Sequence, residues 1–144
     1  MLITKKYNFM STRAQVRFAT REDGVSFSEH PDKIHAQFYV HSDGYPEGLG
    51  LRIACSISEN SPNTSFYGEI EHVQTLHGDL EYIYYIWSDY DKETWISIFH
   101  GYGDEFTDKW KCIFVGKPNK LIATYGSQLD ESYYKLNTND EKRD

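Results

Sequence analysis

The sequence predicts an α+β fold in which an antiparallel β-sheet carries about two helices on one face. Segments with the alternating polarity of β-strands fill both ends of the chain, and two segments with helical spacing lie between them. With 144 residues and a hydrophobic content of 39%, the chain can bury one core but not two. We therefore expect a single domain over residues 10–136, with a flexible N-terminal extension at 1–9 and a flexible tail at 137–144.

The N-terminal third is predicted to form strands. Hydrophobic and polar residues alternate over 14–20 and again over 34–41, which is typical of half-buried strands. Between them, the Asp23-Gly24 pair favours a tight turn that leads into a short strand over 25–28. Three consecutive strands joined in this way predict an antiparallel meander.

A first helix is expected in the middle of the chain, over 46–57. Pro46 suits the first turn of a helix, and Leu49, Ile53 and Ile57 follow at every fourth position. Alternation over part of the same segment leaves a strand as the alternative.

A second helix is predicted over 66–76. Phe66, Ile70, Val73 and Leu76 fall three or four residues apart and would form one apolar stripe. The remainder of the chain is rich in aromatic and β-branched residues, which favour a pleated sheet. The strands expected there cover 80–87, 94–100, 110–116 and 121–125.

The charge distribution restricts the class of partner. A formal net charge of −7 argues against general nucleic-acid binding, which needs clustered lysine and arginine. Acidic residues gather between positions 79 and 108, where Lys92 is the one basic residue. With two neighbouring tyrosines they form a candidate partner-binding surface: Asp79, Glu81, Asp89, Tyr90, Asp91, Glu93, Tyr102, Asp104, Glu105 and Asp108.

Two interpretations of this acidic surface stay open. It can be a solvated face that keeps the protein in solution. Alternatively it binds a basic partner, such as a nucleic-acid-binding protein, by competing for the lysines and arginines that otherwise meet phosphates. The chain has twelve tyrosines and three tryptophans, which favour the second interpretation because such rings are enriched at interfaces.

Segment 41–48 combines more kinds of potential ligand-binding group than any other short segment of the sequence. Its candidate ligand-binding residues are His41, Asp43, Gly44 and Tyr45, which supply an imidazole, a carboxylate, a backbone amide and a phenol just before a predicted helix N-terminus. The segment can be a structural corner in which Asp43 accepts bonds from free backbone N–H groups. It can instead form a pocket for a small anionic or nucleotide-like ligand.

A third hypothesis is that segment 41–48 contributes to the active site of a metal-assisted hydrolase. It would need partners for His41 and Asp43, such as His35, Asp79 or Glu81. Neither a zinc-protease nor a serine-hydrolase motif occurs in the sequence, nor does a dinucleotide or P-loop fingerprint. We therefore assign no catalytic residue, no metal ligand and no cofactor, and expect a protein that is not an enzyme.

Three short motifs carry a resemblance to a known family. They are Ser11-Thr12-Arg13-Ala14, the element His41-x-Asp43-Gly44-Tyr45-Pro46, and Gly78-Asp79-Leu80-Glu81-Tyr82-x-Tyr84. Together they resemble a family of small prokaryotic and phage proteins with an N-terminal Ser-Thr-Arg motif and an HxDGYP element. The resemblance implies a phage or mobile-element origin and no catalytic residues. By analogy of class, it suggests a protein that binds and inhibits a host defence complex, as anti-CRISPR proteins do.

The expected location is the cytoplasm, which would be that of the host for a phage protein. Cys55 and Cys112 are isolated and do not form a disulfide framework, and the N-terminal ten residues lack the apolar stretch of a secretory signal. No run of residues is apolar enough for a membrane span, so no membrane partner is expected. An edge strand leaves a homodimer possible.

Overall fold

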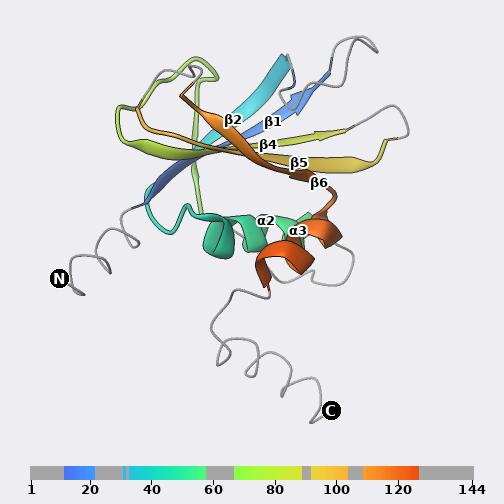
Figure 1. The fold of residues 1–144 in the computed structure, drawn as a ribbon. Helices are drawn as coiled ribbons and strands as arrows, with labels where there is room; N and C mark the ends of the chain where they lie inside the picture. The colour runs from blue at the N-terminus through green and yellow to red at the C-terminus, as the bar shows by residue number, and fades with distance from the viewer. Residues whose placement is uncertain are drawn as a thin grey trace, which may run out of the picture.

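The computed structural model describes residues 12–21, 31, 33–57, 67–88, 92–103 and 109–126. A six-stranded mixed sheet has the strand order β3-β2-β1-β4-β5-β6, and the helices lie beneath one of its faces (Figure 1). The strands are β1 (Arg13–Thr20), β2 (Lys33–Val40), β3 (Glu69–Glu71), β4 (Leu80–Ser88), β5 (Thr94–His100) and β6 (Lys111–Gly116). The helical segments are η1 (Pro46–Gly50), α2 (Leu51–Ile57) and α3 (Pro118–Gly126). The predicted α+β class is confirmed.

The sheet is mostly antiparallel, but its two central strands are parallel. Val16 of β1 lies opposite Phe38 of antiparallel β2 on one side and opposite Tyr84 of parallel β4 on the other. The chain can make this parallel pair because β2, the helices and β3 all intervene between β1 and β4. The expected antiparallel sheet is thus present, with one parallel pair at its centre. The strand predicted over 25–28 and the ends at 1–9 and 137–144 lie outside the described residues.

The helix predicted over 46–57 is confirmed, with one refinement. Its first turn, η1, is a π-helix that begins at Pro46 and runs directly into α2. The buried residues Leu49 and Ile53 lie on the side that faces the sheet, as the sequence spacing predicts.

The prediction of a helix over 66–76 is wrong. Within it, residues 69–71 form the edge strand β3, and Phe38 of β2 pairs with Ile70. Ile70 and Leu76 of the supposed apolar stripe are 73% and 60% exposed, so they are not the buried face of a helix. The side chain that turns inward is Glu71, which accepts hydrogen bonds from polar side chains of β1 and β2.

The strand predicted over 121–125 is also wrong, because these residues belong to α3. Pro118 stands in the first turn of α3, so the Lys117-Pro118 pair marks a helix start and not a hairpin turn. Leu121 is buried, and Ile122 and Tyr125 pack against the same core cluster. Leu121, Ile122 and Tyr125 share one face of a helix because they lie one and four positions apart, a spacing that a search for alternation does not detect.

The face of the sheet beneath which the helices lie forms an apolar core. Its strands contribute side chains at alternate positions, and α2 and α3 contact each other below them. The fully buried members from the strands and helices include Ala14, Val16, Ile53, Ala54, Tyr84, Ile96, Ile98 and Leu121. No helix in the part of the chain that the structure describes has the length and apolar character needed to cross a membrane.

The opposite face of the sheet buries a polar network beside a second aromatic cluster. Arg17 donates from Nε to Gln37 Oε1 at 3.0 Å, from Nη2 to Gln15 Oε1 at 3.0 Å and from Nη1 to the Tyr85 hydroxyl at 2.6 Å. The two glutamines in turn donate from Nε2 to Glu71 Oε2 at 2.8 and 2.7 Å. A buried cation and a largely buried carboxylate are thus bridged by two amides, which fixes the orientation of both amide groups.

Candidate functional site

The corner formed by segment 41–48 is held together by backbone contacts. Asp43 adopts a left-handed conformation with φ of 57°, and its carbonyl accepts a hydrogen bond from Leu49 N–H at 3.0 Å. Gly44 N–H donates to the Thr12 carbonyl at 3.1 Å. A Cβ at Gly44 would lie 2.8 Å from Ala14 Cβ, so this position requires glycine. The corner therefore ties the end of β2 to the start of β1.

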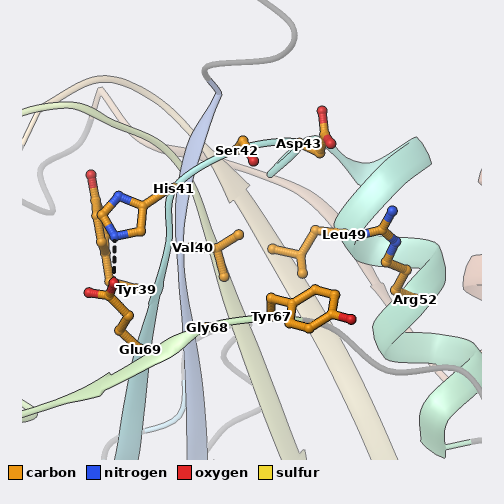
Figure 2. A pocket seen from close by; sticks show the side chains of 10 residues that line it. All are labelled: Tyr39, Val40, His41, Ser42, Asp43, Leu49, Arg52, Tyr67, Gly68 and Glu69. Atoms are coloured by element: carbon orange, nitrogen blue, oxygen red, sulfur yellow. Dashed lines mark ion pairs between the residues drawn. The ribbon is translucent and has the colours of Figure 1, made fainter.

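The predicted ligand-binding side chains of this corner diverge. His41 Nε2 lies 3.1 Å from Glu69 Oε1 of β3, and the imidazole stands edge-on to the Tyr39 ring with centroids 4.5 Å apart (Figure 2). Asp43 points the other way and hydrogen-bonds Tyr45, whose pKa is raised by burial first and then by the Asp43 charge. The arrangement separates the imidazole from the carboxylate, so they do not face one substrate atom.

The residues that a hydrolase would need are spread over the sheet. His35 hydrogen-bonds Thr20 Oγ1 at 2.8 Å, at the end of β2 far from His41. The Asp79 carboxylate accepts from the Tyr39 hydroxyl at 2.7 Å and lies 3.4 Å from Arg13 Nε. Among the described residues, no three histidine, cysteine or acidic side chains are placed to hold a metal ion. The geometry gives the hydrolase hypothesis no support.

A second group of predicted residues does come together, at the end of the sheet where β4 begins and β5 ends. Backbone bonds run from Gly101 N–H to the Glu81 carbonyl at 3.0 Å and from Gly103 N–H to the Leu80 carbonyl at 3.1 Å. They place Tyr102, which is 74% exposed, beside Glu81. The loop thus presents a large exposed aromatic ring at the start of β4, with the His100 ring 6.3 Å away.

Tyr82 links this loop to the first helical turn. Its ring stacks on the His100 imidazole with centroids 4.6 Å apart and an interplanar angle of 18°. Burial raises the pKa of Tyr82 to about 12, and the negative charges of Glu47 and Glu81 add to the shift. Both carboxylates are thus within electrostatic range of one phenol. We call the set Glu47, Glu81, Tyr82 and Tyr102 the acidic tyrosine surface. Asp79 is not part of it, because its carboxylate bonds Tyr39 on the opposite face of the sheet.

The partner-binding set drawn from the sequence omits two members of the acidic tyrosine surface, Glu47 and Tyr82. Glu47 was visible as the acidic residue of the first helical turn, and Tyr82 as part of a tyrosine-rich strand. Their proximity arises only because η1 lies beneath the start of β4, and no local spacing encodes that contact.

The other predicted acidic residues are not gathered here. Glu93 pairs with Lys117 at the opposite end of β5, where Thr94 lies across from Ser88. The remaining candidates lie outside the described residues: Asp89, Tyr90, Asp91, Asp104, Glu105 and Asp108. Of the predicted acids that the structure describes, Glu81 therefore lies beside Tyr82 at one end of β4, Asp79 bonds Tyr39 and Arg13, and Glu93 forms an ion pair at the opposite end of β5.

A pocket of about 270 Å³ opens beside the corner (Figure 2). Its floor is formed by Val40 and Leu49, and its rim carries His41, Glu69 and Arg52. The other lining residues are Tyr39, Ser42, Asp43, Tyr67 and Gly68. The predicted corner residues His41 and Asp43 both line this volume.

Searches against protein-family models, curated proteins and solved structures found no match for this chain.

Proposed function

We propose that this chain is a non-enzymatic interaction protein that binds the basic surface of a partner protein through its acidic tyrosine surface. The observation on which this proposal depends is that Tyr82 stacks on His100, whose ring lies 6.3 Å from the exposed ring of Tyr102, while the charges of Glu47 and Glu81 act on the same Tyr82 phenol. Carboxylates beside aromatic rings suit lysine and arginine side chains, which form ion pairs with the former and cation–π contacts with the latter.

The chemistry of the chain favours a particular class of partner. The net charge of −7 speeds association with a basic protein and disfavours direct contact with nucleic acid. A host protein that normally holds nucleic-acid phosphates with lysine and arginine has the complementary surface. We propose that the chain occupies such a surface in the host cytoplasm, as an inhibitor of phage or mobile-element origin that acts on a defence complex in the manner of anti-CRISPR proteins.

The test measures binding of a fluorescent arginine-rich peptide to the purified chain by anisotropy. The variant Glu81→Lys combined with Tyr102→Ala should weaken binding at least about tenfold, equivalent to roughly 1.4 kcal/mol. Glu93→Lys is the matched control, because it makes the same charge change on an exposed residue at the opposite end of β5. Binding should also weaken as salt is raised, since the contacts are between exposed charges.

Two results would overturn this proposal. One is an equal loss of binding in the control, which would indicate a response to net charge without a defined surface. The other is peptide binding that the double variant leaves unchanged.

A further inference from the structure

Tyr82, His100 and Lys111 form a row across the start of β4, the end of β5 and the start of β6. Tyr82 lies opposite His100 in the antiparallel β4–β5 pair, and His100 lies opposite Lys111 in the β5–β6 pair. The half-buried His100 imidazole stacks on the Tyr82 ring with centroids 4.6 Å apart, and it lies 6.3 Å from the Tyr102 ring. An imidazole thus accompanies both aromatic members of the acidic tyrosine surface.

Charged groups from three neighbouring elements surround this stacked pair. Glu47 on η1 and Glu81 on β4 act electrostatically on the Tyr82 phenol, and the exposed Lys111 on β6 lies on the other side of His100. The pKa of Tyr82 is raised to about 12, so this phenol stays uncharged at neutral pH. Of the side-chain types present here, only the imidazole changes its charge between about pH 8 and 5.

We infer that His100 makes partner binding by the acidic tyrosine surface sensitive to pH: a neutral imidazole permits binding of the basic partner, and a protonated one opposes it. Two effects act in this direction. An imidazolium stacked on Tyr82 is itself a cation on that ring, so it competes with a lysine or arginine of the partner for the cation–π contact. It also adds a second positive charge beside Lys111, which repels a basic partner.

The distances set the size of the expected effect. Two unit charges in water that are separated by 6.3 Å, the distance between the His100 and Tyr102 rings, repel strongly enough to lower an affinity about threefold. The half-buried position of His100 weakens the screening by solvent, so threefold is the lower bound. This inference rests on the proposed function and adds a regulation of the same site.

The experiment measures binding of the fluorescent arginine-rich peptide to the full chain by anisotropy, at about pH 7.5 and 5.5 and at equal ionic strength. Arginine keeps its charge at both pH values, so the peptide itself does not change. The affinity of the unmodified chain should fall at least about threefold at the lower pH.

Two variants assign the change to one imidazole. His100→Phe keeps a ring against Tyr82 but cannot take up a proton, and its affinity should differ by less than about 1.5-fold between the two pH values. His41→Phe is the matched control, because His41 also lies against a tyrosine ring, 4.5 Å from Tyr39, but outside the acidic tyrosine surface. It should keep the full loss of affinity.

A second measurement uses the unmodified chain and does not depend on the folding of a variant. In NMR spectra of the isotope-labelled chain, the ring signals of His100 should move over the same pH range in which the peptide loses affinity. The ring signals of Tyr82 should move with them, because the two rings are stacked.

The inference fails on any of three outcomes. They are a peptide affinity that does not fall with pH, a fall that His100→Phe retains in full, and His100 ring signals that stay fixed over this range. Each leaves the proposed function standing if binding at about pH 7.5 still depends on Glu81 and Tyr102. Conversely, peptide binding that ignores Glu81 and Tyr102 at that pH would refute the proposed function, whatever its pH dependence.

Discussion

The two faces of the sheet are buried by different chemistry. On β1, Val16 points into the apolar core beneath the sheet, and its neighbour Gln15 points into the polar network of the opposite face. Gln15 and Gln37 are 0% exposed, as fully buried as Val16. One face therefore gains stability from apolar area and close packing, whereas the other must complete every hydrogen bond of its buried polar groups.

This difference gives the two faces different tolerance to change. An apolar side chain can be exchanged for another of similar volume at little cost. A member of the polar network cannot, because its loss removes one of the hydrogen bonds that a charged partner makes in a largely buried site. The polar face also constrains the register of β3 on β2, since only one register brings Glu71 to both amides.

The largest expected effect is on the apolar face. Ile98→Ala should lower the free energy of unfolding by about 2–5 kcal/mol, because it removes a fully buried side chain and leaves a cavity. Urea unfolding followed by circular dichroism measures the loss. Ile98→Leu keeps the volume and should cost less than about 1.5 kcal/mol. Equal losses for the two variants would contradict the importance of volume on this face.

The next effect should come from the polar face. Gln37→Leu keeps the approximate volume but removes a hydrogen bond to the Arg17 guanidinium and one to the Glu71 carboxylate. We expect a loss of about 2–3 kcal/mol by urea unfolding, larger than that of Ile98→Leu although both are swaps of similar size. A smaller loss for Gln37→Leu than for Ile98→Leu would contradict the contrast between the faces.

The elements that the sequence predicted correctly are those with a local signal. The strand over 14–20 and the helix over 46–57 recur in the structure because their apolar residues repeat at period two and period four along the chain. Burial itself does not alternate along β1, because Gln15 and Arg17 are buried on the opposite face of the sheet. Residues 66–76 were mispredicted because Ile70 and Leu76 have helical spacing but are exposed, while the inward residue is the charged Glu71. No local sequence pattern predicts that the Glu71 carboxylate is buried.

The parallel pairing of β1 and β4 and the acidic tyrosine surface share one reason for being hard to predict. Each depends on residues that are far apart in the sequence, such as Val16 with Tyr84 and Glu47 with Tyr82. Glu81 and Tyr102 were nominated from charge and aromatic content, which identify the residue types. Their arrangement at one end of the sheet follows from strand pairing, which those contents do not specify.

A smaller effect should distinguish two glycines beside the polar face. A Cβ at Gly101 would lie 2.4 Å from Trp110 of the aromatic cluster, whereas a Cβ at Gly78 would meet nothing within 4 Å. Gly101→Ala should therefore cost about 1–3 kcal/mol through overpacking. Gly78→Ala should change stability by less than about 0.5 kcal/mol. Thermal unfolding of both variants measures this, and a neutral Gly101→Ala would show that Trp110 is free to shift.

The smallest effect concerns pH and the acidic end of the apolar face. The pKa of Tyr82 is raised from 10.0 to about 12, mainly by burial and then by Glu47 and Glu81. Below pH 10 both the folded and the unfolded chain keep this proton, so the contribution of Tyr82 to stability is fully present. As the pH rises from 10 to 12, the unfolded chain loses the proton first, and stability must fall.

Tyr82→Phe removes this titrating group and should make the decline of stability between pH 10 and 12 shallower. Urea unfolding at a series of pH values measures it, with parallel curves for the two chains expected below pH 10. Tyr39, whose pKa is also raised to about 12, keeps part of the decline in the variant, so a reduction and not an abolition is expected. An unchanged slope would mean that the Tyr82 phenol keeps access to water, and the acidic tyrosine surface would then be more open than its stacked Tyr82–His100 pair implies.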